Sequence, residues 1–308
     1  MNFSTKKTFH LLILLIVSLS LNSCEKGQPE DIPSYIRIDR IKLSVSDGQG
    51  SSSEKITDAW VFIDDELIGA FELRDSVPYL TIPILKAGKH KLKIFPGIKM
   101  NGIAATRVPY SLYSPFETEI NLVRDSVIRV HGNLAINNGI PTVKYSASAI
   151  FAWMEDFEQA SLSIDSTSRS LIKIGRTDDP QLIFNLPGEN NQFSGLVIVP
   201  SDTAIFECVS HEQFVLPKNG KDIFLELNYK TNNAVTIGLF VNTSLQTIQE
   251  PLMVLNRNSE WKKIYINLTS AVSMHQDASS FRIFFGIVKE HDVAEARLLL
   301  DNIKLVHF

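Results

Sequence analysis

Short runs rich in Val, Ile, Phe and Tyr recur along this 308-residue chain, and clusters of Gly, Pro, Asn and Asp separate them. This spacing is typical of β-strands joined by turns, because branched and aromatic side chains pack well on a pleated surface and Gly or Asn fits tight turns. Long segments with helical periodicity are hard to find. The chain is therefore predicted to be all-β and built of β-sandwiches.

The first 23 residues have the character of a secretory signal. Lys6 and Lys7 precede an apolar run at 11–21, which is too short to cross a bilayer core of about 30 Å. The run ends in "LNSC", which resembles the lipobox of bacterial lipoproteins. In that family the cysteine, here Cys24, becomes the first mature residue and carries the lipid. The alternative is an ordinary export signal followed by a coincidental cysteine.

An acylated Cys24 implies a membrane anchor, because several acyl chains on one residue hold a protein firmly. After Cys24, residues 25–34 read "EKGQPEDIPS", which is polar and contains prolines, so 24–34 is predicted to be a flexible tether. Its acids resemble the surface-export signals of Bacteroidetes lipoproteins. The expected location is the cell envelope, lipid-anchored to the outer membrane on its periplasmic or surface side.

About 284 residues follow the signal, enough for two domains of common size. The net charge of −4 becomes −6 when Lys6 and Lys7 are removed, and no basic stripe is present, so nucleic acid is not expected as a partner. Apart from Cys24 the sole cysteine is Cys208, so no disulfide can form within the mature chain. A lone cysteine in an alternating apolar stretch is predicted to be buried.

The first predicted domain, residues 35–144, contains a hairpin in "DAWVFIDDELIGAFEL". One strand runs through Trp60 and Phe62, and Trp60 is expected in the core. The turn is predicted at Asp64-Asp65-Glu66, where paired acids suit a tight turn. With the later "GKHKLKIFPG", this order resembles small extracellular sandwich modules of the PEGA or carboxypeptidase-regulatory type. The resemblance implies a spacer or a docking platform.

The second predicted domain, residues 145–308, opens with Asp-Phe-Glu at 156–158 and ends with "LLLDNIKL". Between them lie the strand "DIFLELNYKT" and a strand led by Trp261. This order resembles the carbohydrate-binding jelly rolls of the galactose-binding-like class. The resemblance implies a jelly roll, although the same fold also serves many roles that involve no sugar.

Glycan binding, which this resemblance implies, needs exposed aromatic faces that stack on sugar rings. The candidates are Trp153, Tyr229 and Trp261. Trp153 precedes the first acidic cluster, and Tyr229 could line a concave face. The alternative for both tryptophans is a packing role in the core.

Many such jelly rolls also hold a structural Ca²⁺ between their first and last strands, and the corresponding acids here are Glu155, Asp156, Glu158 and Asp301. Calcium takes six to eight oxygen ligands, which these side chains could supply in part. The alternative is that they are ordinary strand-end acids. No other cofactor is expected.

The sequence shows none of the common catalytic motifs. The pair in "SHEQF" lacks the second histidine of a zinc protease motif, and no phosphate loop or G-x-S-x-G elbow is present. The leading interpretation is a non-catalytic envelope lipoprotein whose jelly roll binds glycan. The alternative is a structural or assembly subunit that packs on another envelope protein and has no small-molecule ligand. Two exposed rings on the concave face would favour glycan, and a large exposed apolar patch would favour a protein partner.

Overall fold

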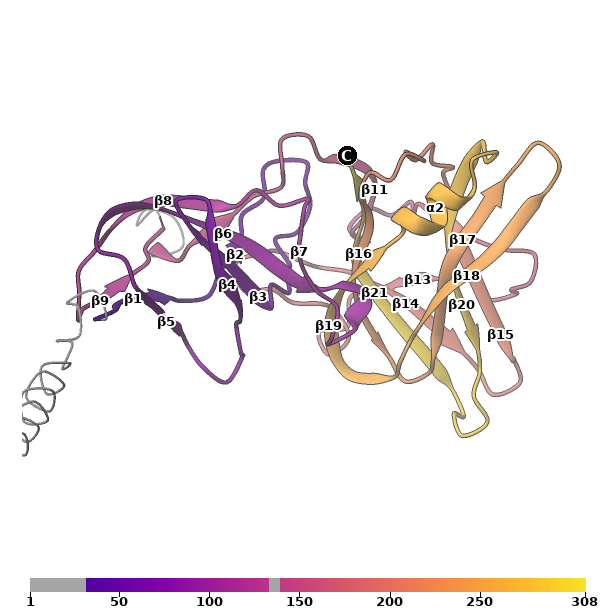
Figure 1. Ribbon diagram of the computed structural model, residues 1–308. Coiled ribbons are helices and arrows are strands. Elements are labelled where there is room, and N and C mark those ends of the chain that lie inside the picture. Colours follow the sequence, from indigo (N-terminus) through magenta and orange to yellow (C-terminus); the bar gives the residue numbers. More distant parts are fainter. Residues whose placement is uncertain (1–31, 133–138) are drawn as a thin grey trace, which may run out of the picture.

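The computed structural model of the chain describes residues 32–132 and 139–308, which consist almost entirely of strands and turns (Figure 1). The described elements include the 3-10 turn η2 (Met100–Gly102) and the helix α2 (Thr269–Met274). No helix in the same ranges has the length and apolar character needed to cross a membrane. The all-β prediction is confirmed. The signal, Cys24 and most of the tether lie outside the described residues.

Three sheets form the N-terminal part of the fold. Their orders are β5-β1-β9, β10-β2 and β4-β3-β6-β7, and β8 also pairs with β6. The pairs β1–β9 and β2–β10 are parallel, and the others are antiparallel. The strands are β1 (Ser34–Ile38), β2 (Lys42–Leu43), β3 (Asp58–Ile63), β4 (Glu66–Glu72), β5 (Leu80–Ile84), β6 (Gly88–Lys99), β7 (Arg107–Pro109), β8 (Phe116–Leu122), β9 (Val127–Arg129) and β10 (Thr142–Val143).

The predicted hairpin is β3–β4, and its turn lies at Asp64 and Asp65 with φ of 51° and 64°. Two successive left-handed residues make the turn that fits the twist of a two-residue hairpin. The prediction for Trp60 is wrong, because Ala59, Val61 and Ile63 fill the core while Trp60 is half-buried on the opposite face. A strand whose two faces are both apolar carries no alternation that fixes its inward side.

Two antiparallel sheets form the C-terminal sandwich. The inner sheet has the order β13-β14-β21-β16-β19, with β11 paired to β21, and the outer sheet has the order β12-β15-β20-β17-β18. The strands are β11 (Ile150–Glu155), β12 (Ile164–Ser166), β13 (Gly175–Thr177), β14 (Ser194–Val199), β15 (Ile205–Ser210), β16 (Ile223–Thr231), β17 (Val235–Asn242), β18 (Thr247–Leu255), β19 (Asn258–Asn267), β20 (Ser280–Val288) and β21 (Ala296–His307).

A single apolar core lies between these two sheets, because alternate residues of each long strand face the partner sheet. Cys208 on β15 is part of it and is fully buried, as predicted. Burial raises the pKa of its thiol far above the ordinary value, so the thiol stays protonated and unreactive.

The inner sheet lies between the N-terminal sheets and the outer sheet (Figure 1). Three side chains from its far face, Phe224, Tyr265 and Val306, belong to the core of the N-terminal part. Glu226, which is wholly buried, accepts hydrogen bonds from the hydroxyls of Tyr110 (2.7 Å) and Tyr145 (2.9 and 3.0 Å). The N-terminal part therefore covers the far face of the inner sheet.

Candidate functional site

The far face of the outer sheet, turned away from the core, carries two adjacent phenylalanine rings. Phe281, Ile283 and Phe285 of β20 point into the core, so the alternation of the strand turns Phe284 to the opposite side. Phe240 lies on the neighbouring strand β17, and the two ring centroids are 5.2 Å apart at 46°. This pair forms an aromatic floor at the centre of the face.

A polar network surrounds this floor, centred on Glu207 of β15, which is 4% exposed. Its carboxylate accepts hydrogen bonds from Thr167 Oγ1 (2.8 Å), Gln249 Nε2 (2.6 Å) and Arg169 Nη1 (3.4 Å). Arg169 also donates to Gln249 Oε1 at 3.1 Å. Each side chain is thus oriented by another, while the Arg169 side chain remains 57% exposed.

This face must curve toward the side that carries the network. Gln249 is on β18 and Glu207 is on β15, and two strands separate them. On a flat sheet three spacings of about 4.8 Å would hold their backbones about 14 Å apart, farther than the two side chains can span. Because their tips meet at 2.6 Å, the sheet bends. Phe284 is turned outward yet is 2% exposed, so atoms of the protein itself cover its ring.

A second polar group continues the face toward the end of β15. Asp165 receives Arg282 Nη2 at 3.2 Å and lies 3.0 Å from His211 Nδ1. Arg282 also donates from Nε to the carbonyl of Ser210 at 2.6 Å. With Arg169 and Glu207, the face carries two guanidinium groups and two carboxylates, so it is close to neutral when His211 is uncharged.

The three predicted ligand-binding residues lie elsewhere. Trp153 (5% exposed) and Tyr229 (7%) are part of the core between the sheets, and Trp153 Nε1 donates to Ser163 Oγ at 2.8 Å. Trp261 is half-buried on the inner sheet, edge-on to Phe184. A ring enclosed by the core offers no face to a sugar. The burial of Trp153 and Tyr229 therefore does not support the ligand-binding role predicted for them. A role for Trp261 stays a prediction.

Sequence reasoning missed Phe240, Phe284 and Glu207, although weak signals were present. In "SFRIFFGIV" aromatic residues occupy both faces of the strand, and in "VTIGLFVN" Phe240 stands among apolar residues, so nothing in the pattern says which rings face outward. Glu207 interrupts the apolar run "IFECVS", and a carboxylate inside an apolar strand indicates a partner brought by the tertiary structure.

The acids predicted to bind calcium are used by the protein itself. Glu155, Asp156 and Glu158 all accept hydrogen bonds from nearby N–H or O–H groups. The donors are Phe157 N (2.8 Å), Ser163 N and Ser163 Oγ (both 2.6 Å) for Glu155, Glu158 N (3.1 Å) for Asp156, and Gln192 N (2.9 Å) and Phe193 N (3.0 Å) for Glu158.

The fourth acid, Asp301, is fully buried, and its carboxylate accepts a hydrogen bond from the side-chain amide of Asn191. Asn191 Nδ2 lies among three oxygens, at 2.8 Å from Phe184 O, 3.3 Å from Phe193 O and 2.9 Å from Asp301 Oδ2. An N–H donor therefore stands where a hard cation would need open oxygens. In residues 32–132 and 139–308 no three His, Cys, Asp or Glu side chains gather as metal ligands. The hydrogen bonds around Asp301 give calcium no support, and the structural Ca²⁺ stays a prediction.

Asp301 should instead make stability depend on pH. Burial is the largest influence on this carboxyl and raises its pKa to about 7. Hydrogen bonds from Ser194, Asn191 and the Asn302 N–H lower the pKa and offset part of that rise. The folded chain then holds a proton that the unfolded chain releases near pH 4, so stability falls as pH rises from about 4 to about 7, by a few kcal/mol at most. We expect Asp301→Asn to flatten this slope in denaturant titrations between pH 4.5 and 8. An unchanged slope would show that Asp301 ionises normally.

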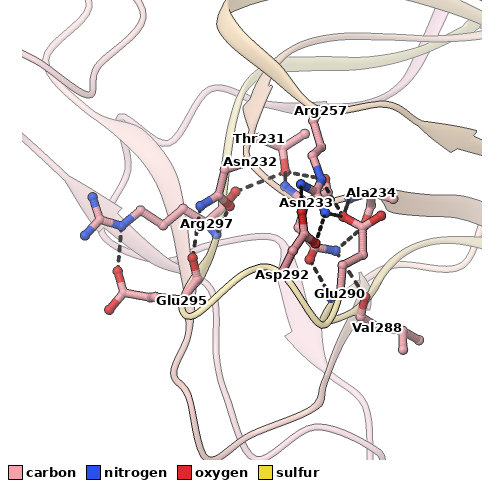
Figure 2. A network of polar contacts seen from close by, with 10 residues as sticks. All are labelled: Thr231, Asn232, Asn233, Ala234, Arg257, Val288, Glu290, Asp292, Glu295 and Arg297. Atoms are coloured by element: carbon pink, nitrogen blue, oxygen red, sulfur yellow. Dashed lines mark hydrogen bonds and ion pairs between the residues drawn. The ribbon is translucent and has the colours of Figure 1, made fainter.

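Another dense polar cluster closes one end of the sandwich, where three loops meet (Figure 2). Asn233 is fully buried, receives the Glu290 N–H at 2.9 Å and donates to the carbonyl of Val288 at 3.1 Å. Arg257 binds Asp292 through two bonds of 2.7 and 2.6 Å. Arg257 also lowers the pKa of the Asp292 carboxyl.

The groups in Figure 2 bond mainly to one another. Thr231 Oγ1 lies within hydrogen-bond distance of the carbonyls of Asn233 (2.8 Å) and Arg297 (3.0 Å), and Asn232 Nδ2 donates to Glu295 O at 2.9 Å. The cluster therefore ties the loops after β16, β18 and β20 together. We assign it a structural role and take the curved face of the outer sheet as the candidate site.

Several solved structures resemble part of this chain. A carbohydrate-binding and catalytic fragment of a Clostridium thermocellum endo-1,4-beta-D-xylanase, complexed with xylohexaose, matches at 13% identity and a TM-score of 0.38, over 51% of this chain and 28% of that one. A xylan-binding domain from Paenibacillus barcinonensis matches at 14% and 0.37, over 51% and 99%. A family 11 carbohydrate-binding module from Clostridium thermocellum, complexed with a mixed-linked tetrasaccharide, matches at 16% and 0.36, over 52% and 96%.

These likenesses involve about half of this chain, and the xylanase is matched over little more than a quarter of its length. No family model matches the chain, and no curated protein does. The all-β sandwich architecture itself rests on the strand pairing described above.

Proposed function

We propose that this chain is a non-catalytic, lipid-anchored protein of the outer membrane that binds glycan on the curved face of its outer sheet. The observation that carries the proposal is the network of Glu207, Arg169 and Gln249 set around the rings of Phe240 and Phe284. Sugar rings offer apolar C–H faces and a periphery of hydroxyls. The half-buried ring of Phe240, which packs against Phe284 and has fixed donors and acceptors beside it, complements both.

The chemistry of the network suits hydroxyl recognition. A guanidinium donates two hydrogen bonds to neighbouring oxygens, and the Arg169 side chain is 57% exposed. Because Glu207, Arg169 and Gln249 already hold one another in place, little side-chain entropy remains to be lost when a sugar binds. The near-neutral face favours an uncharged polysaccharide over a polyanion.

The proposed anchor fits this use of the face. β1, the first strand, lies at the end of the molecule remote from the outer sheet (Figure 1). A lipid on Cys24 would hold the chain by that end and direct the curved face away from the bilayer. A shallow face gives weak single-site binding, and many copies on one membrane would raise the apparent affinity through avidity.

Affinity electrophoresis or calorimetry of residues 25–308 against a panel of soluble polysaccharides tests the proposal. The fragment 145–308 is unsuitable, because Phe224, Tyr265 and Val306 would lose their N-terminal cover. We expect Arg169→Ala to weaken binding at least tenfold, since a hydrogen bond from a charged group contributes about 1.5–3 kcal/mol.

A matched control is Arg297→Ala. Arg297 has a similar side-chain exposure, 55% against 57% for Arg169, and also pairs with one acid. It lies in the polar cluster of Figure 2, away from the candidate site. Its loss should leave binding unchanged. The proposal fails if no polysaccharide binds, or if both variants weaken binding equally.

The second candidate is an assembly subunit, and one observation favours it. A cavity of about 310 Å³ in the N-terminal part has mainly apolar walls, including Phe71, Val77 and Tyr79. A side chain from a partner protein could fill it. The rings on the outer sheet are also half-buried or buried rather than freely exposed. Absence of polysaccharide binding together with stable capture of one envelope protein would favour this candidate.

A further inference from the structure

The sheet β5-β1-β9 presents apolar side chains on its outer face. Ile36, Ile38, Ile82 and Ile84 of this sheet fill the N-terminal core, so the alternate positions face outward. Pro83, Tyr35 and Val127 are register partners in one row across the three strands, and Val127 is 61% exposed.

More exposed aliphatic side chains gather where the described chain begins. Ile32 is 50% exposed, Leu85 71% and Val123 49%. Backbone hydrogen bonds hold these segments together, with Asp125 N donating to Pro33 O at 3.0 Å. Ser34 Oγ donates to the carbonyl of Lys86, next to Leu85, at 2.9 Å. We name Ile32, Tyr35, Pro83, Leu85, Val123 and Val127 the entry patch.

Two arginines form the next row of the same face. Arg37 is the register partner of Arg129, and both pair with the single carboxylate of Asp39, at 3.2 and 2.7 Å. The guanidinium of Arg37 also lies 3.6 Å from the ring centroid of Tyr79. Two guanidinium groups share one acid here, so the row behind the entry patch is net positive.

We propose that the entry patch rests on the lipid surface of the membrane to which the chain is anchored, a proposal that depends on the acylation of Cys24 proposed above. Cys24 and Ile32 are eight positions apart, and at about 3.5 Å per step this segment reaches at most about 28 Å. The anchor therefore keeps the patch close to the bilayer whatever path the tether takes.

The order of residues on this face matches a bilayer surface better than a protein partner. Aliphatic side chains enter the boundary of the acyl chains, tyrosine is favoured at the interface, and arginines one row behind reach the lipid phosphates. Such a contact turns a flexible tether into an oriented support. It fixes which way the curved face at the opposite end of the molecule points.

Depth-dependent fluorescence quenching tests the proposal on the full-length lipidated protein in phosphatidylcholine vesicles. A bimane label is attached to Val127→Cys and, as the control, to Leu245→Cys. Leu245 is 93% exposed and lies between β17 and β18, remote from β1 (Figure 1). Cys208 is fully buried and stays unlabelled, and the sulfur of Cys24 carries the lipid.

We expect brominated acyl chains to quench the label at position 127 at least threefold more than the label at position 245. If the protein floats with the vesicles but both labels are quenched equally, the entry patch does not rest on the lipid surface, while the lipid anchor still holds. Protein that does not float at all would overturn the anchoring, and the seating with it. Glycan binding is measured separately on residues 25–308 in solution, so its failure is distinguishable from either result.

Discussion

Replacing Glu226 with alanine should lower the free energy of unfolding by about 3–5 kcal/mol, which is the cost of removing one partner from a buried ion pair. The carboxylate is wholly buried between the inner sheet and the N-terminal part, and lies 3.2 Å from Lys263 Nζ. Without it the Lys263 side chain, 3% exposed, keeps a charge with no counter-charge, and the hydroxyls of Tyr110 and Tyr145 lose their acceptor.

A second buried amine enlarges this effect. Lys304 is 1% exposed, and burial together with the charge of Lys263 lowers the pKa of its amine to about 7, while Glu226 acts in the opposite direction. Removing Glu226 leaves two buried amines near each other. Lys304 itself is held by the carbonyl of Ser51 at 2.6 Å, across the same contact between the two parts.

The control for Glu226→Ala is the double variant Glu226→Met with Lys263→Met, which removes both charges and keeps apolar volume. It should recover most of the lost stability, because replacing a buried pair with hydrophobic groups is often near neutral. Equilibrium denaturation with guanidinium chloride measures both. A single variant within 1 kcal/mol of the parent would mean that the carboxylate contributes little to joining the two parts.

Replacing Gly238 with alanine should cost about 3 kcal/mol and abolish glycan binding, since overpacking of this kind forces the backbone to shift. A Cβ at this position would lie 2.2 Å from the backbone oxygen of Glu250 and 2.5 Å from Cε1 of Phe284. The oxygen belongs to the paired strand β18 and cannot yield without breaking its register. The ring of Phe284 would leave the floor of the curved face.

Gly286→Ala is the matched control for Gly238→Ala. Gly286 lies on the adjacent strand β20 and faces the same side, but a Cβ there would have its nearest contacts at 3.9 Å. We expect it to keep both the melting temperature and the binding constant of the parent within small changes. A parent-like Gly238→Ala variant would contradict the close packing of the floor and its role in binding.

Local chemistry was sufficient to predict parts of this fold. Asp64 and Asp65 specify a hairpin turn because short polar side chains tolerate the left-handed conformation that the turn needs. Cys208 sits in an alternating apolar stretch that could only be buried. The all-β class could be predicted because apolar runs of strand length are separated by turn residues. Both features can be recognised within a few residues of the sequence.

The sequence could not decide which face of an apolar strand points inward. Trp60 and Tyr229 lie on strands with apolar residues on both faces, and their placement depends on which neighbouring sheet covers which face. The same holds for Phe284, whose neighbours in "RIFFG" are equally apolar. The alternation of side chains along a strand does not distinguish its two apolar faces. The inward face is decided only when a second sheet packs on one of them.

The sequence by itself determined that this protein is built of strands, where a tight turn closes and that Cys208 is buried, because these depend on residues close together along the chain. Only the tertiary structure decided that Gln249 meets Glu207, that Glu226 is enclosed by Tyr110 and Tyr145, and that Asp301 faces Asn191. These partners are 42 to 116 residues apart. Such contacts are set by sheet order and curvature, which no local pattern of side chains records.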